Sequence, residues 1–116
     1  MIWLDKLADL TQFLQNHADI KVLVMDTEFI RERTYFPELA LIQICVNDQI
    51  ALIDPTQPGI AEQLVPLLTN PNILKIMHSS SEDLQAFKAG CGVVPSPIFD
   101  TQVAAALCGL GSGLSY

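Results

Sequence analysis

The chain has 116 residues, of which 50% are hydrophobic, so it is long enough for one domain, or part of one, and too apolar to remain disordered. Its formal net charge of −7 argues against a module that grips nucleic acid chiefly through basic side chains, because such binding depends on Lys and Arg displacing counterions from phosphates. The same charge is compatible with an enzyme whose acids hold divalent metal ions, since the metal reverses the local charge.

Membrane-spanning and secreted classes are also disfavoured. No apolar run reaches the roughly 18 residues of a transmembrane helix, and acids interrupt the apolar N-terminus, unlike a signal peptide. The cysteines, Cys45, Cys91 and Cys108, are far apart, odd in number and without C-x-x-C spacing. Reduced thiols in the core are therefore favoured over a disulfide framework or a zinc site. We expect a cytoplasmic protein without a membrane partner.

The N-terminal half predicts one helix followed by three strands. Leucines at helical spacing predict an amphipathic helix over residues 3–16. The apolar run KVLVM, which ends in acids, predicts a buried strand over residues 22–27. Two β-rich runs, near 39–45 and 49–54, predict a hairpin, because the Asn47-Asp48-Gln49 connection contains residues that tolerate the positive φ of tight turns.

The C-terminal half alternates helices with short strands. The patterns predict helices over 61–70, 79–90 and 101–108 and strands near 73–77 and 96–100. Pro66 is a mild objection to the first of these helices, and Gly90 is a plausible stop for the second. The order predicts an α/β fold with a mixed sheet flanked by helices, in which the strand near 73–77 lies beside the first strand. The antiparallel hairpin argues against a simple parallel doubly wound sheet.

The first candidate site is Asp26-Thr27-Glu28. Side chains at i and i+2 of a strand share a face, so Asp26 and Glu28 should project together from the end of a buried strand. Adjacent carboxylates repel each other unless a cation lies between them, and hard oxygen ligands favour Mg²⁺ or Mn²⁺. The spacing is equally consistent with a strand that runs out into solvent through two hydrated acids.

The second candidate follows the strand near 73–77. Ser79 and Glu82 fit a capping box, and Asp83 lies in the first helical turn, where an acid favours the helix dipole. Asp83 is alternatively a third carboxylate directed at a metal. We interpret His78 as a strand-end histidine with a partner in preference to a ligand, and Asp100 as the N-cap of the last helix in preference to a metal ligand.

The segment between the first two strands is polar and aromatic and is predicted to be a loop. Arg31 and Arg33 could bind phosphate oxygens, or could be an ordinary solvated pair. Tyr35 and Phe36 could stack on a base, although core packing is the favoured reading. The P-loop, the dinucleotide-binding G-x-G-x-x-G and the G-x-S-x-G nucleophile elbow are all absent from the sequence.

Four blocks in succession resemble a known family: VMDTEFIRERTYFPELALIQ, LIDP, KIMHSSSEDL and FDTQ. Together they resemble ribonuclease D, one of the DEDD exonucleases with a ribonuclease H-like fold, over roughly residues 20–110. The resemblance implies that Asp26, Glu28 and Asp83 bind metal, with two Mg²⁺ or Mn²⁺ ions at the scissile phosphate. It further implies a 3′-to-5′ exoribonuclease that releases nucleoside 5′-monophosphates from RNA with a free 3′ end, as in tRNA maturation.

The family's last block, a tyrosine followed four residues later by a fourth aspartate, does not occur in this sequence. We therefore expect residues 1–116 to form a C-terminally incomplete exonuclease domain, weak or inactive, whose exposed apolar surface favours self-association. One alternative is a non-catalytic nucleic-acid or protein interaction module that retains the fold. Another is a phosphoacceptor-type regulatory domain, but that class needs a lysine at a strand end, and Lys75 lies before the end of its strand.

Overall fold

The computed structural model describes residues 1–30, 38–78 and 80–109. Its centre is a six-stranded mixed sheet with the order β1-β4-β3-β2-β5-β6. The strands are β1 Ile2–Leu4, β2 Val22–Ile30, β3 Glu38–Val46, β4 Gln49–Ile53, β5 Leu74–Met77 and β6 Ile98–Asp100. The helices are α1 Leu7–Asn16, α2 Ile60–Thr69, α3 Ser81–Cys91 and α4 Thr101–Leu107. No helix in these ranges is long and apolar enough to cross a membrane.

The pairing confirms the predicted mixed sheet. β3 is antiparallel to both β2 and β4, whereas β1 is parallel to β4, and β5 is parallel to both β2 and β6. The hairpin of β3 and β4 turns at Asn47 and Asp48, whose φ angles of 49° and 67° are those of a type I′ connection. The predicted position of β5 beside β2 is also confirmed.

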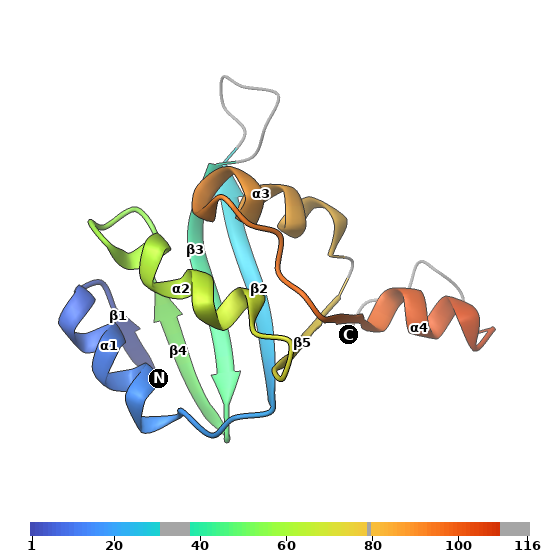
Figure 1. Ribbon diagram of the computed structural model, residues 1–116. Coiled ribbons are helices and arrows are strands. Elements are labelled where there is room, and N and C mark those ends of the chain that lie inside the picture. Colours follow the sequence, from blue (N-terminus) through green and yellow to red (C-terminus); the bar gives the residue numbers. More distant parts are fainter. Residues whose placement is uncertain (31–37, 79, 110–116) are drawn as a thin grey trace.

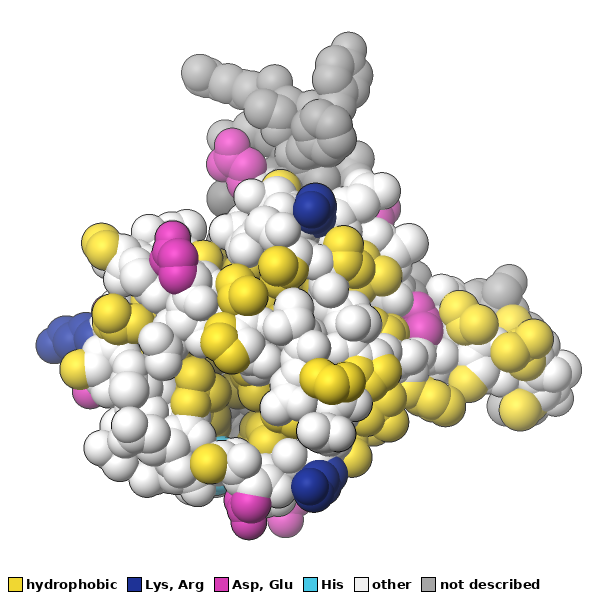
Figure 2. Space-filling model, in the orientation of Figure 1, with side chains coloured by type: hydrophobic (Ala, Val, Ile, Leu, Met, Phe, Trp, Pro, Cys, Tyr) yellow, Lys and Arg dark blue, Asp and Glu magenta, His cyan; other side chains and the backbone are white. Residues whose placement is uncertain are grey.

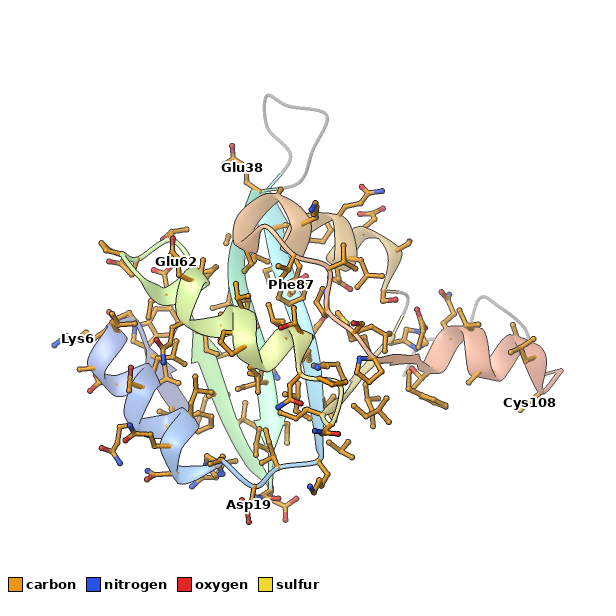
Figure 3. The ribbon with its side chains drawn as sticks, in the orientation of Figure 1. Lys6, Asp19, Glu38, Glu62, Phe87 and Cys108 are labelled. Atoms are coloured by element: carbon orange, nitrogen blue, oxygen red, sulfur yellow. The ribbon has the colours of Figure 1, made fainter. Side chains whose placement is uncertain are left out.

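The helices α1, α2 and α3 cover one face of the sheet, and α4 stands off beside it (Figure 1). Apolar residues at alternate positions of the central strands point under these helices, among them Leu23, Ile42 and Ile44. Phe87 of α3 is fully buried between its helix and the sheet (Figure 3). The core therefore lies in a single layer between the sheet and these three helices.

The opposite face of the sheet and the last helix expose apolar groups. Val24 and Phe99 are each 47% exposed. No residue of α4 between Thr101 and Leu107 is buried, and hydrophobic side chains gather on this helix (Figure 2). The described helices thus leave one side of the sheet open.

Several predicted boundaries were wrong. The first helix begins at Leu7, not at residue 3, because Ile2–Leu4 pairs with β4 as a short parallel strand. The first long strand continues past residue 27 to Ile30, where pairing with β3 extends it. The third helix passes Gly90 and is capped by Gly92, whose φ of 79° is the left-handed value that favours glycine.

One local expectation about a polar side chain and one about the thiols also change. The N-cap of α3 is Ser80, not the predicted Ser79, and its side chain makes no bond to its own helix. Pro66 is accommodated inside α2, as predicted. All three thiols are free, but only Cys45 and Cys91 are partly buried, so Cys108 is not a core residue.

Candidate functional site

Three neighbouring parallel strands end at the same edge of the sheet. β2, β5 and β6 are adjacent and parallel, and ligands of open α/β sheets bind beyond the carboxyl ends of such strands. His78 follows β5 directly, and Asp100 is the last residue of β6. The pairing of β2 with β5 ends at Val24, so Asp26 and Glu28 lie on the part of β2 that extends beyond β5. The predicted site residues of these strands are thus brought to one edge.

β2 presents its side chains alternately to the two faces of the sheet. Leu23 and Thr27 are buried on the face covered by the helices, whereas Val24 is 47% exposed on the open face. Asp26 and Glu28 follow the alternation of Val24, and they are half-buried and exposed, respectively. The two acids therefore share a face of β2, as their spacing predicts.

Asp83 approaches β2 from the side that the helices cover. Its carboxyl Oδ1 accepts a hydrogen bond from the hydroxyl of Thr27, and only 7% of the residue is exposed. Burial raises the pKa of Asp83 above its usual value; the Thr27 hydrogen bond opposes this rise, and the charges of Asp26, Glu82 and Glu28 add to it. The acids of β2 and α3 are therefore near enough to repel one another, although they reach the edge of the sheet from different sides of β2.

The chemistry of these donors fits a hard divalent cation. All three predicted ligands offer carboxylate oxygens, which Mg²⁺ and Mn²⁺ prefer. The raised pKa of Asp83 marks a buried carboxyl whose negative charge is not balanced by its surroundings. Within residues 1–30, 38–78 and 80–109, no three His, Cys, Asp or Glu side chains form a group tight enough to hold a metal ion. Asp26, Glu28 and Asp83 thus share one region of negative charge without forming a complete set of metal ligands.

His78 and Asp26 line one cavity of about 340 Å³ on the open face of the sheet. The Nδ1 atom of His78 lies 2.7 Å from the Thr101 hydroxyl oxygen. Because that hydroxyl donates to the Met77 carbonyl at 3.4 Å, its lone pairs can accept from His78, and we assign the proton to Nδ1. The interpretation of His78 as a strand-end histidine with a partner is confirmed.

The basic and aromatic candidates of the first loop, Arg31, Arg33, Tyr35 and Phe36, lie outside the described residues, as does Ser79. The predicted N-cap role of Asp100 is confirmed, because its side chain accepts from the backbone N–H groups of Gln102 and Val103.

Sequence reasoning missed two contacts. Thr27 is the buried partner of Asp83. The sequence signal that could have predicted its direction is its place between Asp26 and Glu28, because a residue between two that share one face of a strand points to the other face. Asp100 also binds Ser80 across 20 residues of sequence, for which no local pattern exists.

Comparison with known proteins shows the family and the fold to which the chain is similar. A family model described as 3′-5′ exonuclease matches residues 1–116. Ribonuclease D of Xanthomonas oryzae pv. oryzae is 51% identical over 114 residues, which are 98% of this chain and 31% of the relative. Ribonuclease D of Escherichia coli K12 is 45% identical over 87 residues, 75% of this chain and 23% of the relative.

Solved structures show the same fold. The crystal structure of Escherichia coli RNase D superimposes with a TM-score of 0.90 at 35% identity, covering 98% of this chain and 30% of that one. The catalytic core of RRP6 from Trypanosoma brucei matches with a TM-score of 0.87 at 21% identity, covering 97% and 32%. The chain thus spans about a third or less of each of these four proteins. With the family model covering its full length, the chain belongs to the 3′-5′ exonuclease family.

Proposed function

We propose that the protein is a metal-dependent 3′-to-5′ exoribonuclease that releases nucleoside 5′-monophosphates from RNA 3′ ends. In this proposal Asp26, Glu28 and Asp83 hold two Mg²⁺ or Mn²⁺ ions. The observation that carries it is the placement of the three acids: Asp26 and Glu28 share the open face of β2, and the buried carboxyl of Asp83 is hydrogen-bonded to Thr27, which lies between them in sequence. Such an arrangement needs a cation to become stable in its ionised form.

When bound, such ions activate water and stabilise the leaving oxygen of a phosphodiester. The described residues would have separate duties around them. Asp26 and Glu28 would bind the ions from the open face of β2, and the Thr27 hydroxyl holds one oxygen of Asp83 in place. The other oxygen of Asp83 is the one we assign to the metal.

RNA is the proposed substrate because curated relatives that are up to 51% identical to this chain bear the name ribonuclease D. The Escherichia coli relative is described as an exoribonuclease involved in structured RNA processing, and we extend that class, including tRNA 3′ ends, to this protein. Arg31, Arg33 and His78 are the proposed contacts to the RNA. The unpaired cysteines agree with a cytoplasmic site of action.

The activity is proposed for the whole protein, because this chain spans 31% of its Xanthomonas oryzae relative. The resemblance assigns a fourth aspartate and a tyrosine to the family, and neither belongs to the residues 1–116 that match it. We therefore expect the 116-residue chain alone to be near background, since single positioned groups commonly contribute about 10²–10⁴-fold in rate.

A chimaera tests the proposal directly. The chain replaces the matching segment of Xanthomonas oryzae ribonuclease D, to which it is 51% identical. Release of labelled 5′-mononucleotides from a 3′-labelled oligoribonucleotide is measured with Mn²⁺. The chimaera should be active, and Asp26→Asn should lower its rate by at least ~10²-fold. Full activity of the Asp26→Asn chimaera would refute the assignment.

A non-catalytic interaction module that retains the fold is the second candidate. It is favoured by the finding that no three acidic or histidine side chains of the described ranges form a metal-holding group. This candidate predicts that the folded chimaera binds the oligoribonucleotide equally with and without Mn²⁺ and releases no mononucleotide.

A further inference from the structure

A single carboxylate joins the beginnings of two helices. Oδ2 of Asp100 accepts hydrogen bonds from the backbone N–H of Ser80 at 2.7 Å and from the Ser80 hydroxyl at 2.8 Å. Its Oδ1 accepts from the N–H groups of Gln102 at 2.9 Å and Val103 at 3.3 Å. Ser80 is the N-cap of α3, and Asp100 is the N-cap of α4. Asp100 therefore ties the start of α3 to the end of β6.

This link is close to the candidate metal ligand of α3. Ser80 accepts the first helical bond, from the N–H of Leu84 at 2.8 Å, so its position fixes the first turn. Asp83 lies in that turn. Only 6% of Ser80 is exposed, so few water molecules could replace Asp100 as the acceptor for its N–H. Movement of Ser80 would move the backbone that presents Asp83 to β2.

The same two segments are joined a second time. Met77 of β5 pairs with Asp100 of β6, and His78 bonds to Thr101 at 2.7 Å. The turn between β5 and α3 is thus held against the junction of β6 and α4 at both of its ends. Of these contacts, those of Asp100 are the ones that reach the backbone of α3.

Both oxygens of Asp100 are already occupied by protein donors. A carboxylate offers about four lone-pair positions, and the four bonds to Ser80, Gln102 and Val103 use that number. The same carboxylate is therefore poorly suited to bind a metal ion as well. Its contacts to Ser80 instead hold the first turn of α3 in position.

We propose that Asp100 is a positioning residue of the candidate metal centre, which orients Asp83 through Ser80 without binding the metal. The inference rests on the proposed function, because the contact from Asp100 to Ser80 affects metal binding only if Asp83 binds a cation. Partners of this indirect kind typically contribute about 10–100-fold in metal affinity.

Asp100→Asn separates the two duties of this side chain. Asparagine remains a favourable N-cap, so its oxygen can still accept from the start of α4, while its amide nitrogen cannot accept from Ser80. Asp54→Asn is the matched control, because Asp54 also accepts from a nearby backbone N–H, that of Thr56 at 3.0 Å, but follows β4 on the far side of β3 from β2.

Two readouts are taken on the 116-residue chain: amide hydrogen exchange of the first turn of α3, and Mn²⁺ affinity by calorimetry. Asp100→Asn should accelerate exchange at Leu84 and weaken Mn²⁺ binding by about 10-fold, with exchange within α4 unchanged. Ser80→Ala, which keeps the backbone N–H contact, should give a smaller change in both. The Asp54→Asn control should match the wild type in both.

Unchanged exchange and affinity in Asp100→Asn would overturn the inference, and so would weaker Mn²⁺ binding with exchange at Leu84 unchanged, which would make Asp100 a ligand. A wild-type chain that binds no Mn²⁺ would instead contradict a metal centre formed by Asp26, Glu28 and Asp83 within this chain, whereas the proposed function is tested separately by the chimaera. The exchange rates of Asp100→Asn and Ser80→Ala would then decide by themselves whether the contact positions α3.

Discussion

Lys75 lies in the middle of β5 and is fully buried, with 0% of its surface exposed. Its ammonium donates to the backbone carbonyls of Asn70 at 2.9 Å and Ser96 at 2.8 Å. These contacts join the turn before β5 to the segment before β6. Burial lowers the pKa of Lys75 below its usual value. We predict that the side chain is structural, and that Lys75→Ala and Lys75→Met divide its contribution into stem and charge.

The magnitude follows from what each substitution removes. Lys75→Ala deletes three buried methylene groups beyond Cβ, worth about 0.8 kcal/mol each, or about 2.4 kcal/mol together. Both variants leave the Ser96 carbonyl without its ammonium donor, which costs about 1–3 kcal/mol and is partly offset by removal of a desolvated charge. We expect a loss of about 1 kcal/mol for Lys75→Met, which keeps a stem of similar volume, and about 3–4 kcal/mol for Lys75→Ala.

The pH dependence has a definite sign. A lowered pKa means that the folded state binds the proton less tightly than the unfolded state, so wild-type stability rises as pH increases toward the unfolded value near 10.5. Lys75→Met lacks this contribution, so the stability gap between the two proteins should widen with pH. Urea denaturation from neutral pH to about pH 10 measures the gap. Equal losses in the two variants, or a gap that narrows with pH, would refute the reasoning.

Three further predictions concern the acids, the thiols and the open face. Asp83→Asn should stabilise the chain at pH 7, because burial and neighbouring acids raise the pKa of Asp83, and urea denaturation should show the gain vanishing below about pH 3.8; a loss at pH 7 would contradict this. Iodoacetamide at pH 8 should label exposed Cys108 well before Cys91, because burial raises the Cys91 pKa to about 11. Mass spectrometry measures the order of labelling, and labelling of Cys91 first would contradict this prediction. Sedimentation should detect self-association that Val24→Lys reduces, since Val24 is 47% exposed on the open face; a monomer at every concentration would count against it.

Most of the fold could be predicted because its signals are local. Apolar runs marked the buried strands, and Asn47-Asp48 marked the hairpin through backbone angles that few residues tolerate. β1 was missed because a strand of three residues is too short to show a period, and Leu4 also fits the helical spacing of Leu7. Its formation depends on β4, whose partner residue for Leu4 is Ile53.

The features of the candidate site likewise divide into local ones, which the sequence predicts, and long-range contacts, which it does not. The shared face of Asp26 and Glu28 follows from the two-residue period of a strand, and the place of Asp83 in a first helical turn follows from the capping pattern around it. The bond from Thr27 to Asp83 spans 56 residues, and that from Ser80 to Asp100 spans 20. Such contacts depend on how strands order themselves in the sheet, which neither propensity nor spacing encodes.

The side chain of Ser80 illustrates the physical reason. A serine at a helix start is expected to cap its own helix, and the sequence offered Ser79 and Glu82 for that role. In the structure the Ser80 hydroxyl donates to Asp100 instead, because β6 places a half-buried carboxylate beside it. A charged acceptor of this kind forms a stronger hydrogen bond than a neutral one, so the tertiary contact prevails over the local one.

Calorimetric titration with Mn²⁺ tests the central claim, that Asp26, Glu28 and Asp83 share a divalent metal. The wild-type chain and the Asp54→Asn control should bind Mn²⁺ alike, because Asp54 accepts its hydrogen bonds from Thr56 and Gln57 beyond β4. Asp26→Asn should weaken binding by at least ~10-fold, since it removes one carboxylate ligand. Equal affinity of all three proteins for Mn²⁺ would show that Asp26 is not a ligand and would contradict the account.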